Sequence, residues 1–160
     1  MAQKRTTKAA TDLQNLSYLG LLSERLSELI AEQTAVLFKR ENIRIPVKSC
    51  SLVETLVQIQ PASASDLASS MGRSHQIIMQ KLPKLVDLGL IERRSDPNDG
   101  RRFLHQLTKA GREEWARLQK LNPKITKAYL EIEKEEGPVH AQILAAINSL
   151  ERRGLADRIR

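Results

Sequence analysis

Apolar residues recur at spacings of three and four over most of the chain, which predicts a mainly helical protein. The longest such stretch covers residues 13–39, where charged residues occupy the other faces and the apolar stripe is formed by Leu13, Leu16, Leu19, Leu22, Leu26, Leu29 and Ile30. A leucine-rich helix of this length needs a surface to cover its stripe. That surface can belong to the same subunit or to a second copy.

The middle of the chain predicts three short helices separated by turn residues. Pro46 interrupts the first long helix, a short apolar helix follows over 52–57, and Pro61 marks a turn. Ser63 lies three residues before Asp66, close to the pattern of a capping box, and opens a helix that ends at Gly72.

The third short helix is the most polar on its exposed side. Ser74 is a favourable N-cap for it, and Gly89 ends it after Leu88. From Leu90 the apolar period changes to two, so residues 90–94 and 103–107 predict a pair of strands joined by a turn-rich loop over 95–102.

Two further helices are predicted after the hairpin. Thr108 caps a helix over 109–135, in which Pro123 predicts a kink or a break after Leu121. Pro138 suits the first turn of a last helix, whose apolar residues are Val139, Ile143, Leu144, Ile147 and Leu150. The order of elements predicts a mainly α (α+β) fold, a helix-turn-helix with a β hairpin or wing, flanked by amphipathic end helices.

Composition and charge narrow the classes of partner. The 160 residues carry a net charge of +7, which favours an anionic partner, although solubility alone also explains such a charge. Only 3% of the residues are aromatic, too few for the stacking platforms of single-strand binders, so duplex nucleic acid is favoured. The single cysteine, the lack of a membrane-length apolar run and the lack of a secretion signal in the basic N-terminus predict a cytoplasmic protein without membrane contact.

The third short helix has the residues that a DNA-recognition helix needs. Ile78, Leu82 and Leu85 form its inner stripe, and polar side chains at its N-terminal end face outward. Gln76 or Gln80 can pair with adenine, and His75 can donate to guanine. The whole outward set is Ser74, His75, Gln76, Met79 and Gln80. An ordinary amphipathic helix with a solvated polar face remains the alternative.

The hairpin adds the clustered positive charge. Between residues 73 and 109 there are eight basic and four acidic residues, and four arginines flank the hairpin tip. An arginine at such a tip can enter a narrow minor groove, and basic residues around it can bind phosphates. The candidate phosphate ligands are Lys84, Arg93, Arg94 and Arg102. A solvated charged turn is the alternative.

The hairpin and its surroundings resemble the MarR family of winged helix-turn-helix transcription regulators. The run from Asp96 to Gly111 matches the family wing pattern D-P-x-D-x-R-x-x-x-x-x-L-T-x-x-G, and residues 65–68 and 88–91 resemble the family's helix-turn-helix. The motif matches cover about residues 63–111, and the helix order fits nearly the whole chain.

The resemblance implies a homodimer in which the first, fifth and sixth helices interlock two subunits. It divides a single domain over 1–160 into a basic arm (1–12), dimerisation helices (13–42 and 109–160) and a winged helix-turn-helix lobe (46–108). It implies that Asp99 helps to hold Arg101, which enters the minor groove. It also implies that bases or nearby phosphates are faced by Ser74, His75, Gln76 and Gln80. It also implies release from DNA by a small, often phenolic, molecule, while other members respond to thiol oxidation or metal.

Three residues depart from the family pattern. Pro83 lies inside the recognition helix and is expected to bend its C-terminal half. His105 occupies a strand position where an aliphatic residue is usual, and a packed, hydrogen-bonded histidine is favoured over a sensor. Cys50 is expected to be a buried structural thiol rather than a redox switch.

No metal-ligand spacing, phosphate loop or nucleophile motif is found in the sequence, so no cofactor, metal or enzymatic activity is predicted. The sequence therefore predicts a homodimeric regulator that binds a pseudo-palindromic operator in double-stranded DNA, a repressor released by a small-molecule effector. Two alternatives stay open: an effector-independent winged helix protein that acts through protein contacts, and an architectural duplex binder without sequence preference.

Overall fold

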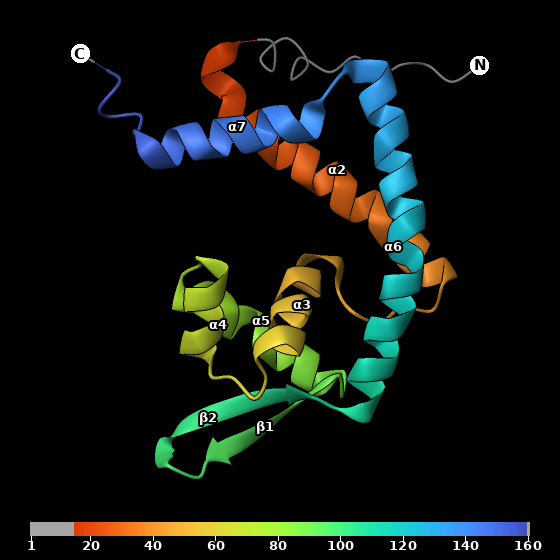
Figure 1. Ribbon diagram of the computed structural model, residues 1–160, viewed down its shortest axis with the longest axis vertical. Coiled ribbons are helices and arrows are strands. Elements are labelled where there is room, and N and C mark those ends of the chain that lie inside the picture. The colour runs from red at the N-terminus through yellow and green to blue at the C-terminus, as the bar shows by residue number, and fades with distance from the viewer. Residues whose placement is uncertain (1–14, 160) are drawn as a thin grey trace. The chain divides into compact units, whose positions relative to one another are not determined.

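The computed structural model describes residues 15–159 and confirms the predicted mainly helical fold with one hairpin (Figure 1). The elements follow one another as η1 (Leu16–Tyr18), α2 (Leu19–Arg40), η2 (Val47–Ser49), α3 (Cys50–Ile59), α4 (Ala64–Met71), α5 (His75–Asp87), β1 (Ile91–Asp96), β2 (Asp99–Leu107), α6 (Lys109–Glu136) and α7 (Val139–Arg152). The basic arm predicted at 1–12 lies outside the described residues. Two compact units meet inside α6, one ending at Arg117 and the other beginning at Leu118.

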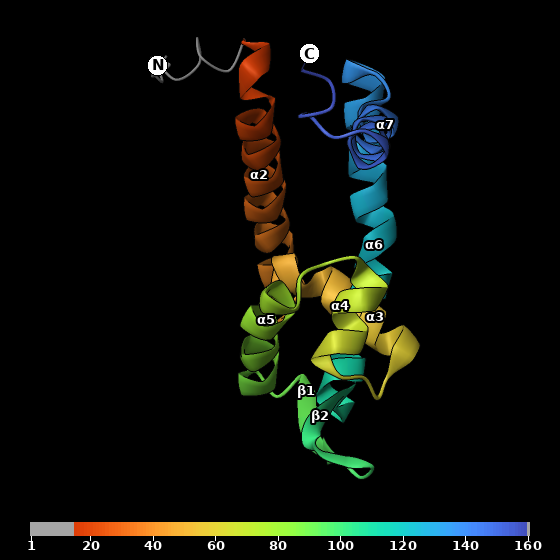
Figure 2. The same cartoon turned by 90° about the vertical axis from the view of Figure 1, so that its left-hand side faces the viewer.

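The first unit is built around the packing of α3, α4 and α5 on the base of the hairpin. Each of these helices buries its apolar stripe, and the side chains with no exposed surface are Leu52, Val53, Leu56, Leu67, Ile78, Leu85 and Leu90. Full burial of one such aliphatic side chain stabilises a fold by roughly 1.5–3 kcal/mol. The β1–β2 ribbon extends beyond these helices (Figures 1 and 2).

The predicted helix caps are confirmed. The Asp66 backbone N–H donates to the Ser63 hydroxyl at 3.2 Å, and the Ser63 backbone N–H donates to the Asp66 carboxylate at 2.9 Å, so aspartate completes the capping box. Gly72 ends α4 with φ +57°, a conformation that favours glycine. Ser74 then caps α5 through the Ile77 N–H. These caps set where the helix-turn-helix bends.

The hairpin strands are longer than the sequence predicted. The ladder continues through the expected loop, where Ser95 pairs with Phe103 and, after an irregularity, Asp96 pairs with Asp99. The Asp96 side chain accepts the Asn98 N–H at 2.9 Å, and this Asx contact lets only two residues connect the strands. The prediction of a loop over 95–102 is therefore wrong, because the hydrogen bond from the Asn98 N–H to the Asp96 side chain allows a shorter turn.

A short third segment extends the sheet beside β2. Ala62 and His105 exchange two backbone hydrogen bonds, at 3.0 and 2.8 Å, in an isolated antiparallel bridge. This bridge attaches the wing to the segment that leads into α4.

The first turn of α6 packs tightly against the backbone of Leu90, the residue before β1. A Cβ at Gly111 would lie 1.9 Å from the Leu90 carbonyl oxygen, so only glycine allows this approach. Glu114, with 1% of its surface exposed, accepts the Arg44 backbone N–H at 2.9 Å and the Arg44 Nε–H at 3.0 Å. As predicted, the Thr108 hydroxyl caps α6, accepting the Gly111 N–H at 3.0 Å.

Neither internal proline ends its helix. Pro123 lies inside α6, which runs unbroken to Glu136, so the break expected after Leu121 does not occur. Pro83 likewise lies inside α5. A proline removes one backbone donor, and the neighbouring i to i−4 hydrogen bonds are sufficient to continue both helices.

In the second unit, α7 follows Pro138, which is its N-cap, and no residue of α7 is buried. Its exposed apolar side chains are Ile143, Leu144, Ile147 and Leu150. No helix among residues 15–159 has the length and hydropathy to cross a membrane.

Candidate nucleic-acid interface

Helix α5 presents its polar N-terminal half to solvent because its apolar stripe is fully buried. Ile78, Leu82 and Leu85 face the core, with at most 2% of their surface exposed. At about 100° per residue, Gln76 and Gln80 lie on the side opposite this stripe, and both are exposed. The two glutamines are therefore placed to contact a partner without any change in the fold.

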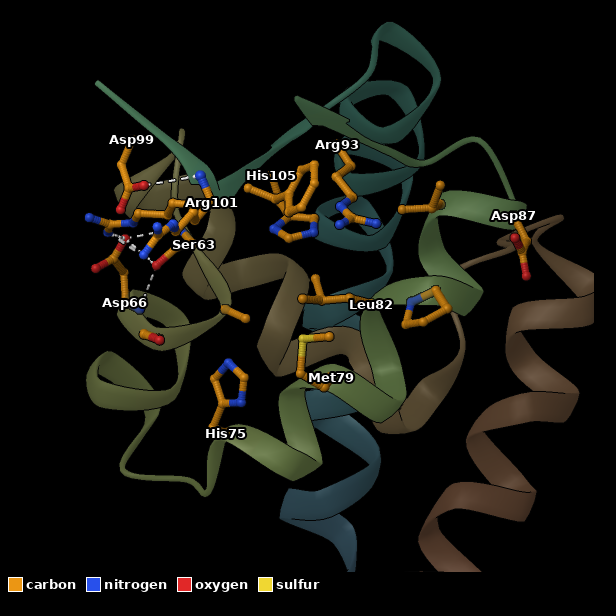
Figure 3. Close-up of a pocket in the computed structure, with 16 residues that line it drawn as sticks. Ser63, Asp66, His75, Met79, Leu82, Asp87, Arg93, Asp99, Arg101 and His105 are labelled. Atoms are coloured by element: carbon orange, nitrogen blue, oxygen red, sulfur yellow. Dashed lines mark hydrogen bonds and ion pairs between the residues drawn. The ribbon is translucent and has the colours of Figure 1, made fainter. Parts of the chain in front are cut away.

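A groove of about 750 Å³ separates α5 from the wing and the start of α4 (Figure 3). His75, Met79 and Val86 line it from α5, and Phe103 and His105 line it from β2. The sequence-predicted residues Arg93, Asp99, Arg101 and Arg102 line it as well. One candidate of the helix and four of the hairpin thus border one concave surface, whereas Ser74, Gln76, Gln80, Lys84 and Arg94 do not line it.

The arginines of the wing have different partners. The Arg93 guanidinium lies over the Phe103 ring, 3.4 Å from its centroid. Arg94 pairs with Glu92 on the same strand at 2.8 Å. Both contacts stay within the ribbon, so these two arginines are held close to the hairpin surface.

The pair Asp99 and Arg101 is joined through the backbone. The Asp99 carboxylate accepts the Arg101 backbone N–H at 3.0 Å, as Figure 3 shows. Within residues 15–159, the Arg101 guanidinium makes no hydrogen bond or ion pair. The contact shapes the tip and leaves the charge of Arg101 available.

Arg102 differs from the other three because two of its partners, Ser63 and Asp66, lie at the start of α4. Its Nη2 donates to Asp66 Oδ2 at 2.5 Å and to the Ser63 hydroxyl at 3.1 Å, and Asp96 Oδ2 lies 3.9 Å from its Nε. The Ser63 backbone N–H and hydroxyl, followed by Arg102, hold the pKa of the Asp66 carboxyl below its ordinary value. Asp66 is therefore ionised at neutral pH.

His105 is buried as expected, but it is not hydrogen-bonded as expected. Only 5% of its surface is exposed, and its Nδ1 has no hydrogen-bond partner among the described residues. It lies across the groove from Met79 and Leu82 (Figure 3). Burial is the main cause that lowers the pKa of His105, so the imidazole is neutral at pH 7. The expectation failed because no acceptor or donor among the described residues reaches its Nδ1.

A second group of basic residues lies on the other flank of α5. The Lys81 ammonium donates to the Lys48 carbonyl oxygen, and burial, followed by the charges of Arg73 and Lys48, lowers the pKa of Lys81. Lys84 is exposed one turn further along α5. Sequence reasoning missed Lys48 because only the tertiary fold brings it to α5, whereas the spacing of Lys81 and Lys84 on one helix was a usable signal.

Cys50 shows no sign of activation as a thiolate. Burial raises the pKa of its thiol to about 11, and the Sγ lies 3.8 Å from the Pro46 carbonyl oxygen. Within the described part of the chain, no three His, Cys, Asp or Glu residues are grouped as metal ligands.

The fold and this surface define a winged helix-turn-helix protein. The model of the MarR family matches residues 47–103, which contain η2, α3, α4, α5, β1 and residues 99–103 of β2. Over these residues the chain is similar to the MarR family. No curated protein sequence is similar enough to the chain to count as a match.

Solved structures share the fold at low sequence identity. The transcriptional repressor CouR, bound to a 23-mer DNA duplex, matches with a TM-score of 0.63 and 21% identity, covering 84% of this chain and 92% of that one. The MepR–DNA complex from S. aureus matches with 0.63 and 21%, covering 85% and 98%. PcaV from Streptomyces coelicolor, in complex with its natural ligand, matches with 0.63 and 20%, covering 93% and 98%.

Proposed function

We propose that the protein is a transcription regulator that binds double-stranded DNA with α5 in the major groove and Arg101 of the wing in the adjacent minor groove. The observation that carries this proposal is the exposure of Gln76 and Gln80 on the outer side of α5 and of Arg101 on the neighbouring wing. His75 at the start of α5 and Arg101 line the same groove. A glutamine can pair bidentately with adenine in the major groove. An unpaired arginine suits the negative potential of a narrow minor groove.

The structural neighbours support a duplex as the partner. CouR and MepR share the fold and were both solved on DNA. Ser74, His75, Lys84, Arg93, Arg94 and Asp99 complete the proposed interface around α5 and the wing, with Lys48 and Lys81 as additional basic residues on the far flank of α5.

The test is duplex binding measured by fluorescence anisotropy. The wild-type protein should select an inverted repeat from random duplexes, and its affinity should fall steeply with salt because phosphate contacts release counterions. Arg101→Ala should remove most of the affinity. Lys120→Ala, which removes one exposed charge of α6 outside the proposed interface, is the matched control and should bind like the wild type.

Gln76→Ala tests base reading separately from affinity. We expect a changed sequence preference, with each lost bidentate contact reducing discrimination by about 1–3 kcal/mol. Equal weakening on all sequences, or a wild-type protein that ignores duplexes at low salt, would contradict the proposal.

We also propose that the protein is a homodimer. Leu19, Leu22, Leu26 and Ile30 recur along one side of α2 and are 38–52% exposed, and α7 exposes a similar set. Monomeric proteins rarely expose contiguous apolar faces of this kind. Sedimentation equilibrium should give twice the monomer mass, and Leu26→Glu should shift the protein toward the monomer.

The finer proposal is a repressor released by a small aromatic molecule. The support is PcaV, which shares the fold and was solved with its natural ligand. A thermal-shift screen with phenolic compounds should show saturable stabilisation, and the same compound should weaken duplex binding. Stabilisation without an effect on DNA binding would contradict release by that compound.

A further inference from the structure

Arg102 lies next to Arg101 but has a different environment. Both arginines line the groove beside α5, and successive residues of a strand point to opposite faces. Arg102 reaches Ser63 and Asp66 in the first turn of α4. Of the two arginines, only Arg102 is therefore tied to the start of α4 by hydrogen bonds within residues 15–159 of the structure.

The contact of Arg102 is the outer of two attachments between β2 and the segment leading into α4. The inner attachment is the backbone bridge between Ala62 and His105. Three residues of strand, roughly 10 Å, separate the two attachments. Residues between Arg102 and the turn have β1 as their neighbouring strand, and an isolated two-stranded ribbon is only marginally stable.

We propose that Arg102 is a positioning residue, which fastens the outer half of the wing to the first turn of α4 and so holds Arg101 in place for DNA. This inference rests on the proposed function, and it replaces the sequence-based prediction that Arg102 is a phosphate ligand. Asp66 has two roles in it, as the capping residue of α4 and as the anchor of the wing.

Removing the charge of Asp66 distinguishes between two alternative roles of Arg102, phosphate binding and positioning of the wing. If Arg102 binds phosphate, Asp66→Asn frees the guanidinium and removes a negative charge near DNA, so affinity stays the same or rises. If Arg102 positions the wing, Asp66→Asn removes the anchor and affinity falls. An asparagine oxygen can still accept the Ser63 N–H, so the cap of α4 is retained.

The first experiment measures affinity for a duplex that the wild-type protein has selected from a random pool. Arg102→Gln and Asp66→Asn should each weaken binding by about three- to fivefold, a modest effect because the pair is partly exposed. In an Arg101→Ala background, Arg102→Gln should weaken binding no further, because its effect passes through Arg101. A purely structural defect would act in both backgrounds and would lower Tm.

The pair Arg94 and Glu92 provides the matched control, since it also joins an arginine of the wing to a carboxylate but stays within β1. Glu92→Gln should bind the duplex as tightly as the wild type or more tightly. If Asp66→Asn behaves like Glu92→Gln while Arg102→Gln weakens binding, Arg102 is a phosphate ligand and the proposal is overturned.

The second experiment needs no DNA. Hydrogen exchange of the backbone amides of residues 99–103 should become several-fold faster in Arg102→Gln and in Asp66→Asn, and should stay unchanged in Arg94→Gln. Unchanged exchange in the first two variants would overturn the anchor even if the wild-type protein binds DNA. Faster exchange in a protein that ignores duplexes would instead contradict the proposed function and, with it, the role of the anchor in DNA binding.

Discussion

The winged helix lobe and the helices α2 and α7 have the same apolar spacing but opposite burial. Leu56, Leu67 and Ile78 of the lobe have no exposed surface, whereas Leu19 of α2 is 52% exposed and Ile147 of α7 is 47% exposed. The difference shows that the lobe satisfies its apolar pattern within the chain. The end helices leave much of theirs exposed.

The largest expected effect tests the tight packing of the lobe. Gly111→Ala places a methyl group 1.9 Å from the Leu90 carbonyl oxygen, so α6 has to move away from the lobe. We expect a loss of about 3 kcal/mol or more in the free energy of unfolding, measured by urea denaturation. Gly20→Ala in α2 is the matched control, because nothing lies within 4 Å of its new Cβ, and it should stabilise the helix by about 0.5–1 kcal/mol. Equal effects of the two changes would remove the contrast between the regions.

The second prediction compares one apolar side chain from each region. Leu56→Ala should cost about 2–5 kcal/mol of unfolding free energy at any protein concentration, because it leaves a cavity in the lobe. Ile147→Ala should instead weaken association, by about 1 kcal/mol or more, in sedimentation equilibrium. A loss of stability for Ile147→Ala that is independent of protein concentration would show that α7 is covered by its own chain.

The smallest expected effect concerns the one buried group of the lobe that lacks a partner within residues 15–159. His105→Leu should raise the free energy of unfolding by about 1 kcal/mol, because it removes a buried nitrogen without a hydrogen bond.

The same variant should change the response to acid. Burial lowers the pKa of His105 in the folded protein below its ordinary value of about 6.5. As the pH falls below that value, the unfolded chain therefore binds a proton that the folded protein does not bind. The free energy of unfolding decreases as a result, until the pH reaches the lowered pKa. Thermal unfolding between pH 7 and 5 should show a smaller loss of Tm for His105→Leu than for the wild type. An equal loss would mean that other groups cause the acid sensitivity.

Local features of the fold were predictable from the sequence, whereas the partners of several charged residues were not. The predicted positions of the three short helices and their caps at Ser63 and Ser74 are confirmed, since each cap depends on residues within four positions. The hairpin was predicted, but its loop was made too long because the Asx contact of Asp96 was not recognised. The candidate residues around the groove stay predictions about DNA, and the structure adds that they border one surface.

The sequence by itself determined the order of elements, the caps of the short helices α4 and α5, and the presence of cationic residues on a hairpin after a polar helix. These depend on hydrogen bonds and side-chain periodicity over a few residues. Only the tertiary structure decided that Arg102 is paired with Asp66 and that Glu114 is buried against Arg44. It also decided that His105 Nδ1 has no hydrogen-bond partner among residues 15–159. Such outcomes depend on which distant groups meet once the core is packed, and short-range patterns carry no information about that.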